Sequence, residues 1–373
     1  DIHRTLVGPF IAAERPSPLD LVRRVGLARL DALWRTAPWQ TMWQALGAHF
    51  RDARLRQLFG RYATYCGCSP FLAPATLMLV AHVEQDGVWL VRGGMVRVAQ
   101  AIQALAESQG AAFRFGAHVA EILVEAGRAT GVRLADGERI AADAVLFNGD
   151  VGALPQGLVG DAARGAAREV PRAARSLAAV TWCVRAATAG FPLHHHNVFF
   201  AEDYAEEFAA IFARRGITAA PTVYLCAQDR GVGEVAPGTP ERMLLLVNAP
   251  PDGDRRDVAP ELPDLAERSL GLLRACGLEM TLEGAIPTTP TGFDALLPGT
   301  GGALYGRASH GATGTFARPG ATTRLPGLYC AGGSVHPGPG IPMAAMSGRI
   351  AAARMLEDLA GTARRAIRLP APA

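Results

Sequence analysis

The chain has 373 residues, 49% of them hydrophobic, which is enough for two or more domains with a substantial core. Its 37 basic and 34 acidic residues leave a formal charge of +3, and the scattered basic residues argue against nucleic acid as a partner. All 37 basic residues are arginine, because the sequence contains no lysine, which excludes Schiff-base enzymes and Walker-A phosphate sites.

The six cysteines are widely spaced and form no C-x-x-C pair, which favours a reducing compartment. Cys66 and Cys68 flank a glycine, where a loop is favoured over a metal or redox site. The first ten residues lack the charged and apolar segments of a secretory signal. The apolar run 71–83 is interrupted by Pro74 and is shorter than the roughly 18 residues of a membrane-spanning helix, so we expect no span.

The first predicted element is helical. Ser17 stands as a capping residue before Pro18 at the first turn, and Asp20 completes a box-like start. Apolar residues then fit one helix face, with arginines between them and tryptophans after them; these are Leu19, Val22, Val25, Leu30, Leu33, Trp34, Trp39 and Trp43. An amphipathic helix that packs on its own core and an interfacial helix at lipid headgroups both fit this pattern.

Residues 87–150 predict a strand, a helix and a β-meander. The strand is "GVWLVR" (87–92), and the helix that follows stops at Gly110, where a C-terminal glycine cap belongs. Apolar and polar residues then alternate, with glycine-containing turns between short strands. The last of these strands ends at Asn148-Gly149-Asp150.

Residues 151–291 predict a mixed α/β domain. Three adjacent histidines, 194–196, lie in this domain. Adjacent residues of an extended segment point to alternate sides, so the three cannot all face one metal; a solvated turn is favoured, and we expect no metal site. Strands are expected at 176–186, 197–201, 222–228 and 243–249, and helices at 204–215 and 263–277.

The stretch "LYCAGGSVHPGPGIPMAAMSGRIAA" (328–352) begins like a strand, ends it in two glycines and begins a helix near Pro342. A helix amino end offers unpaired N–H groups and partial positive charge, which suit an electron-rich or anionic group. Small residues there would let a large flat ligand lie against the backbone. A tight packing seam between helix and strand, with no ligand, also fits.

Several motifs together resemble the bacterial carotenoid desaturases, flavoproteins of the phytoene desaturase type within the amine-oxidase-like FAD group. They are "GVWLVRGGM", "ADAVLFNGD", "GALYGRASHG", "FARPG" and the stretch just described. The resemblance covers roughly residues 61–359. On "YATYCGCSPFLAPA" and "ALYGRASHG" it is nearest to the hydroxyneurosporene (1-hydroxycarotenoid 3,4-) desaturases.

The resemblance implies an α/β (α+β) fold: a split FAD-binding Rossmann-type fold of the glutathione-reductase and amine-oxidase group, a mixed-sheet substrate domain and a helical region for membrane contact and substrate access. Such proteins should begin with a strand, G-x-G-x-x-G and a helix, but this motif is absent from the 373 residues. We therefore expect a chain that starts about 100 or more residues into its parent, and whether it binds FAD or is active alone stays open. The expected regions are 1–86 (helical), 87–150 (FAD segment), 151–291 (substrate domain), 292–360 (FAD segment) and 361–373 (flexible tail).

The resemblance also assigns residues to the FAD cofactor. Two glycines would admit its ribityl chain and pyrophosphate, N–H groups at the helix start would face the isoalloxazine ring, and a backbone position of the meander would hold the adenine. The end of the strand that leaves the cofactor domain would lie near the cofactor. In that order the residues are Gly332 and Gly333; Pro342, Met343 and Ala344; Val119; and Asn148 and Asp150.

The implied reaction removes a hydride from an allylic carbon of the polyene to flavin N5, and a proton from the neighbouring carbon. Because the conjugated chain stabilises the developing cation, the protein mainly positions the polyene and needs no strong base. His336, Tyr305 and His310 are candidates to line the flavin or accept the proton. Each could instead make a structural hydrogen bond in a glycine-rich loop.

An acyclic carotenoid substrate lives in lipid, which implies a cytoplasmic protein held peripherally at the inner (photosynthetic) membrane. Residues 19–43 and 71–83 are the expected contacts. Quinone and oxygen are both open as electron acceptors. The alternatives are a phytoene desaturase, an amine oxidase or protoporphyrinogen-type oxidase, and a carotenoid-binding protein without flavin.

Overall fold

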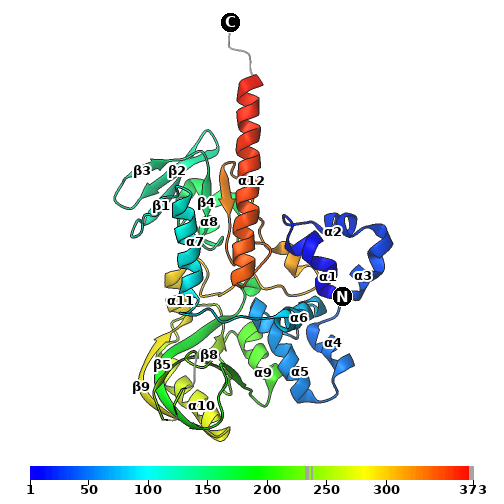
Figure 1. Ribbon diagram of the computed structural model, residues 1–373, viewed down its shortest axis with the longest axis vertical. Helices are drawn as coiled ribbons and strands as arrows, with labels where there is room; N and C mark the ends of the chain where they lie inside the picture. Colours follow the sequence, from blue (N-terminus) through cyan, green and yellow to red (C-terminus); the bar gives the residue numbers. More distant parts are fainter. Residues whose placement is uncertain (232–234, 237, 369–373) are drawn as a thin grey trace.

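The computed structural model describes residues 1–231, 235–236 and 238–368, with side chains described as far as residue 361. Figure 1 shows three parts: N-terminal helices on one side, a region built around small sheets and the long helix α12, and a five-stranded sheet below them. The site discussed below lies where these parts meet.

The N-terminal part is helical, as predicted. Ser17 accepts the Asp20 N–H and Asp20 accepts the Ser17 N–H, so the predicted capping box opens α2. The expected single helix face is wrong, because Gly26 at φ +86° ends α2 and the chain restarts as α3. The helices are α1 (Ile2–Leu6), α2 (Pro18–Val25), α3 (Leu30–Arg35), α4 (Met42–His49), α5 (Ala53–Gly60) and α6 (Leu79–Asp86).

Trp43, on α4, belongs to the core rather than to an exposed aromatic stripe. Its ring centroid lies 4.7 Å from that of Phe71, and the Arg56 guanidinium sits 4.6 Å above the ring. The tryptophans before it in the chain are exposed, Trp34 to 69% and Trp39 to 48%. The tryptophans of the segment 19–43 therefore differ: Trp34 and Trp39 face solvent, and Trp43 packs against the core.

The next part holds α7 (Val96–Ser108) and an antiparallel meander of β1 (Val119–Glu125), β2 (Arg128–Leu134) and β3 (Arg139–Ala141), as predicted. The strand expected at 87–92 does not form: its side chains are largely exposed and no strand of the described chain pairs with it. β4 (Val145–Phe147) leaves the meander and pairs in parallel with β10 (Leu328–Cys330).

The large sheet has the order β6-β7-β8-β5-β9, and every neighbouring pair is antiparallel, so the mixed sheet expected from the sequence is wrong. The strands β8 and β9, which α10 connects, do run parallel to each other. However, β5 lies between them and pairs antiparallel with both. The strands are β5 (Ala178–Gly190), β6 (His196–Phe199), β7 (Val223–Ala227), β8 (Glu241–Ala249) and β9 (Leu278–Thr288).

Helix α10 (Leu262–Ala275) packs on one face of this sheet and α9 (Tyr204–Phe208) on the other (Figure 1). Leu265 and Leu273 of α10 are buried against Leu225 and Val247 of the sheet. Fully burying such a side chain stabilises the fold by about 1.5–3 kcal/mol. The sheet and α10 therefore form the main core of the chain.

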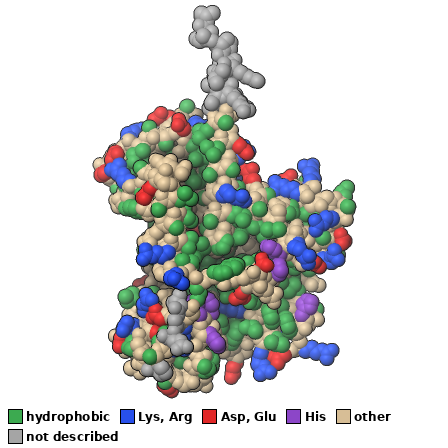
Figure 2. Space-filling model, viewed as in Figure 1, with side chains coloured by type: hydrophobic (Ala, Val, Ile, Leu, Met, Phe, Trp, Pro, Cys, Tyr) green, Lys and Arg blue, Asp and Glu red, His purple; other side chains and the backbone are tan. Residues whose placement is uncertain are grey.

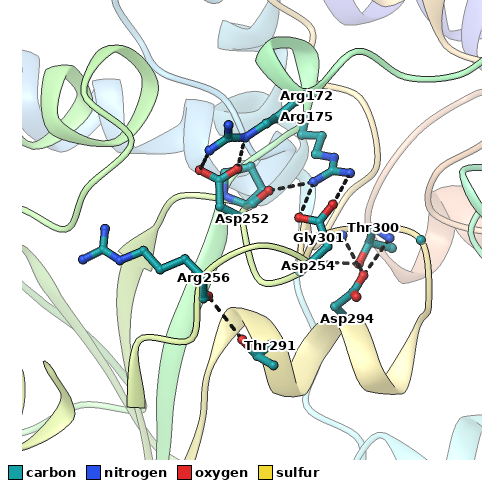
Figure 3. Close-up of polar contacts among 12 residues, drawn as sticks. Arg172, Arg175, Asp252, Asp254, Arg256, Thr291, Asp294, Thr300 and Gly301 are labelled. Carbon is teal, nitrogen blue, oxygen red and sulfur yellow. Dashed lines mark hydrogen bonds and ion pairs between the residues drawn. The ribbon is translucent and has the colours of Figure 1, made fainter. Parts of the chain in front are cut away.

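Arginine–aspartate pairs tie the start of β5 to the loop after β8 (Figure 3). Asp252 accepts from Arg172 at 2.5 Å and also pairs with Arg215, while Asp254 accepts from Arg175 at 2.9 Å. Burial raises the pKa of Asp252, but these hydrogen bonds outweigh it and hold that pKa at about 2. The network fixes the loops that carry α8 (Ala153–Gln156) and α11 (Pro290–Leu296).

Helix α12 (Ile341–Arg368) runs for 28 residues and projects beyond the rest of the fold in Figure 1. The region expected to be a flexible tail from residue 361 is thus helical as far as Arg368, and residues 369–373 lie outside the described residues. Across the described ranges, no helix combines the length and hydropathy that crossing a membrane requires.

Candidate active site

The paired strands β4 and β10 bring two predicted segments together. Both strands are parallel, so their carboxyl ends meet at one edge, where open sheets commonly bind ligands. The Ala331 N–H donates to the Phe147 carbonyl at 3.1 Å, and the Asn148 Nδ2 donates to the Ala331 carbonyl at 3.1 Å. Asn148 thereby lies beside the glycine pair that follows β10.

The two glycines differ in the space around them. Gly332 adopts φ +122°, and a Cβ there would lie 3.2 Å from the Asn148 Nδ2. A Cβ on Gly333 would meet no described atom within 4 Å. The Gly332 N–H donates to the Ser347 Oγ at 2.8 Å, which in turn donates to the Ala344 carbonyl at 2.6 Å. The loop is thus fixed to α12 and leaves bare backbone at Gly333.

The start of α12 is exposed beside this loop. Pro342 has no N–H, and the Ala344 N–H already donates to the Gly340 carbonyl at 2.9 Å. The N–H groups expected around Pro342, Met343 and Ala344 would therefore be those of Ile341 and Met343, and their role at the flavin stays a prediction. A bare glycine backbone beside a helix amino end fits a flat, electron-rich group such as an isoalloxazine.

Asp150 and Arg318 lie beneath the same loop. Burial raises the pKa of the Asp150 carboxyl, which accepts the Gly152 N–H at 2.8 Å. Arg318 is only 2% exposed and donates to the carbonyls of Tyr305 and Gly333 at 2.9 Å and of Arg307 at 2.7 Å. Arg318 was not among the predicted site residues, although it stands in the "FARPG" motif.

Two of the predicted catalytic residues hold loops together. The His336 Nε2 faces the carbonyls of Phe10 at 2.9 Å and Ala13 at 3.1 Å, and so carries the proton. The His310 Nε2 accepts the Ser69 N–H at 3.1 Å, and burial lowers its pKa to about 4. Both rings are therefore neutral at neutral pH, with the contacting nitrogen already engaged.

The third candidate, Tyr305, lines a cavity of about 200 Å³. The large sheet forms one wall of this cavity, and the segment after α5 forms the other. Burial raises the pKa of the Tyr305 phenol, which keeps it protonated. The other lining residues are Arg61, Thr64, Tyr65, Leu177, Ala178, Val198, Tyr224, Leu246, Asn248 and Leu304.

The wall of this cavity contains polar atoms that are buried without a hydrogen-bond partner in the described part of the chain. They are the Arg61 Nη1 and, close behind, the Tyr204 hydroxyl. The Asn248 Nδ2 donates to the Glu207 Oε1 at 2.8 Å, and burial raises the pKa of Glu207. Arg61 lines the cavity with a guanidinium group, which can donate to a polar ligand atom.

Val119 does not join the other predicted cofactor residues. It lies at the start of β1, where it pairs with Leu134 in the three-stranded sheet, whereas Asn148 and Gly332 follow the strands of the parallel pair. An FAD molecule whose adenine is held by Val119 would therefore reach from one sheet to the other. This role stays a prediction.

Comparisons with known proteins identify the family of this chain. Residues 29–356 match the family of flavin containing amine oxidoreductases. A hydroxyneurosporene desaturase of Rubrivivax gelatinosus is 56% identical over 368 residues, which cover 97% of this chain and 70% of that protein. A hydroxyneurosporene desaturase of Cereibacter sphaeroides is 45% identical over 367 residues, covering 95% and 71%. A 1-hydroxycarotenoid 3,4-desaturase of Flavobacterium is 34% identical over 312 residues, covering 81% and 62%.

Among solved structures, an oxidoreductase from Methanosarcina mazei superposes with a TM-score of 0.56 at 16% identity, covering 89% of this chain and 72% of that one. This likeness supports the fold predicted from the sequence. The family match confirms the predicted flavin cofactor, FAD, and the assignment as an oxidoreductase. The chain belongs to the flavin containing amine oxidoreductase family and, within it, to the carotenoid desaturases.

Proposed function

We propose that this protein introduces a double bond near the hydroxylated end of an acyclic carotenoid, with FAD as the hydride acceptor. The relatives named above support the reaction class. One observation carries the proposal: Tyr305 lines the cavity, and Arg318 donates both to the Tyr305 carbonyl and to that of Gly333 in the glycine loop. The substrate cavity and the cofactor loop are therefore neighbours.

A cavity of about 200 Å³ holds only the end of a long polyene. Its apolar wall suits the hydrocarbon, while Arg61, Asn248 and the phenols of Tyr65, Tyr224 and Tyr305 suit a terminal hydroxyl. In a 1-hydroxycarotenoid that is desaturated at carbons 3 and 4, the hydroxyl-bearing carbon lies two positions from the reacting bond. A polar pocket next to the cofactor loop is where such a substrate needs it.

The bare backbone at Gly332 and Gly333, the N–H of Met343 and the side chains of Asn148 and Asp150 would hold the flavin, with Val119 at the adenine. When bound, FAD takes the hydride removed from an allylic carbon. The chain itself positions the polyene end, excludes water and lines the cavity with a neutral Tyr305 phenol. His336 and His310 fix the surrounding loops, which places them as positioning residues.

We further propose that the protein meets its lipid-soluble substrate at a membrane surface through its N-terminal helices. An apolar groove of about 460 Å³ runs between α1, α2 and α3, bordered by Trp34 and Trp39. Exposed aromatics beside arginines favour the lipid interface. Sedimentation with anionic vesicles should fall for Trp34→Ala combined with Trp39→Ala, and be unchanged for Trp89→Ala, at a tryptophan elsewhere that is even more exposed.

The central experiment measures anaerobic bleaching of FAD near ~450 nm, with the chain, FAD and either 1-hydroxyneurosporene or neurosporene. Arg61→Met should raise about tenfold or more the concentration of the hydroxylated carotenoid that gives half-maximal bleaching rate, and leave that of neurosporene unaffected, because in the proposed complex Arg61 donates only to the hydroxyl. Arg56→Met, a half-buried arginine outside the cavity, is the matched control. Equal losses for both substrates would contradict recognition of the hydroxyl, and bleaching by neither would contradict the proposed reaction.

A further inference from the structure

One cluster of side chains takes no part in the function proposed above. His195 and His196 at the start of β6 lie beside Cys226 on β7, and their ligand atoms are all within 4.8 Å of one another. We propose that these three side chains bind a divalent transition-metal ion, with Zn²⁺ as the natural candidate. The site lies on the open edge of the large sheet, beside Tyr224 of the cavity wall.

The strand register creates the cluster. His196 and Cys226 are directly opposed partners on the antiparallel strands β6 and β7, so their side chains share one face of the sheet. His195 precedes the first residue of β6 and sits at a bend, where strict alternation of side chains does not hold. Its Nε2 lies 3.6 Å from the Cys226 Sγ.

The prediction from sequence excluded a metal because three consecutive histidines of a strand cannot face one ion. That argument assumed that the histidines would be the whole ligand set. The structure uses only two of them and takes the third ligand from a neighbouring strand 30 residues further along the chain. Such a set leaves no recognisable spacing in the sequence.

The surroundings orient the rings as metal sites require. The His195 Nδ1 contacts the Arg230 carbonyl, which directs a proton to Nδ1 and leaves the Nε2 lone pair facing Cys226. Arg230 is itself fixed by Glu241 and by the Leu193 carbonyl. The His196 Nδ1 contacts the Tyr224 hydroxyl at 2.8 Å, so its Nε2 is free to coordinate.

The donor chemistry selects the class of ion. Two imidazoles and one thiolate are ligands for Zn²⁺ and its neighbours in the transition series, whereas Mg²⁺ and Ca²⁺ prefer oxygen. One thiolate and two neutral imidazoles supply a single negative charge, leaving a fourth position for the Tyr224 hydroxyl or a water. The Arg230 guanidinium is already paired with Glu241 and so does not repel the ion.

The proposal is tested by titrating the full chain with Co²⁺ while absorption is recorded. The chain carries no affinity tag and is first treated with a chelator. One Co²⁺ per chain should bind with thiolate-to-metal charge-transfer bands and tetrahedral d–d bands, and Zn²⁺ should displace it. Cys226→Ser should abolish the charge-transfer bands, and His195→Gln should weaken binding by about 100-fold or more. The matched controls are Cys276→Ser, at an exposed cysteine, and His194→Gln, the adjacent histidine outside the cluster.

A second readout needs no variant. Zn²⁺ should slow the reaction of Cys226 with a thiol reagent, measured by peptide mass spectrometry, while Cys276 reacts at an unchanged rate. The proposal is overturned if Co²⁺ gives no thiolate bands, if these bands survive Cys226→Ser, or if His194→Gln weakens binding as much as His195→Gln. This last result would mean simple chelation by a run of surface histidines.

Discussion

The large sheet and helix α7 bury their apolar side chains to very different degrees. Leu225, Val247 and Leu273 in the sheet and α10 have no exposed surface. On α7, all of whose residues are described, no residue is buried, and Ile102 and Leu105 are 57% and 63% exposed. Figure 2 shows hydrophobic side chains gathered in the middle of the molecular surface seen in that view, beside α12.

The two regions therefore obtain their stability differently. The five-stranded sheet forms a large core with α10, whereas β4 and β10 have three residues each and join a smaller core that includes Ile122, Leu154 and Val335. Loops beside this smaller core are also held by hydrogen bonds, such as those of Arg318 and Ser347. We expect a glycine loop held this way to respond to a ligand without disturbing the large sheet.

The largest effect is expected at Arg318. Arg318→Met keeps an unbranched apolar stem but leaves three buried carbonyls without their donor, at about 1–3 kcal/mol each. We expect a loss of at least about 3 kcal/mol in the free energy of unfolding of the cofactor region, measured by urea denaturation with hydrogen exchange. Arg242→Ala, which removes an exposed pair with Asp229, should cost under about 1 kcal/mol. Equal losses would refute the dependence on Arg318.

A matched pair of leucines tests the comparison directly. Leu273→Ala in α10 should destabilise the chain by about 2–5 kcal/mol because it opens a cavity in the core. Leu105→Ala in α7 should change stability by less than about 0.5 kcal/mol, since the side chain is mostly in solvent. Thermal and urea unfolding of both variants provide the measurement, and similar losses would mean that α7 is covered in solution.

The two glycines of the cofactor loop should differ in their effect on FAD. Gly332→Ala forces a side chain into φ +122° against Asn148, a strain of about 1–3 kcal/mol, and should weaken FAD binding about tenfold or more. Gly333→Ala meets open space in the structure, so any loss of affinity there would come from the bound flavin itself. Titration of FAD by fluorescence quenching measures both. Unchanged affinity in both variants would argue against the loop as a flavin site.

The smallest expected effect concerns acid. The pKa of Asp252 falls from its ordinary 3.8 to about 2 in the folded chain, so its ion pairs stabilise the fold above about pH 4 and lose this effect as the pH falls toward 2. Asp252→Asn should flatten the acid limb of the stability curve in that window and lower stability at neutral pH. Circular dichroism between pH 2 and 5 follows this. An unchanged acid limb would show that other carboxyls dominate.

The elements with strong local signals were predictable from the sequence. The capping box at Ser17 and the alternating strands β5 to β8 follow from short-range patterns, and the structure confirms them. β9 was missed because its residues are mostly exposed and lack a buried alternating face. The segment 87–92 has the composition of a strand, but pairing depends on a neighbour that local sequence does not specify.

The candidate site likewise has parts that were predictable from the sequence and parts that were not. The glycine loop was visible in the sequence because Gly332 must accept a positive φ next to a helix start. The clamp by Arg318 and the cavity wall at Arg61 depend on loops far apart in the chain, so no local pattern indicated them. His336 and His310 looked catalytic by residue type, and only their partners place them in the loop framework.

The position of β9 has a consequence for solubility. This 11-residue strand pairs only with β5 in the described chain, which leaves a long sheet edge able to recruit strands from other molecules. Pro287 removes a backbone donor from it, and the exposed Glu279 places negative charge along it. We expect these two residues to act as gatekeepers against edge-to-edge aggregation.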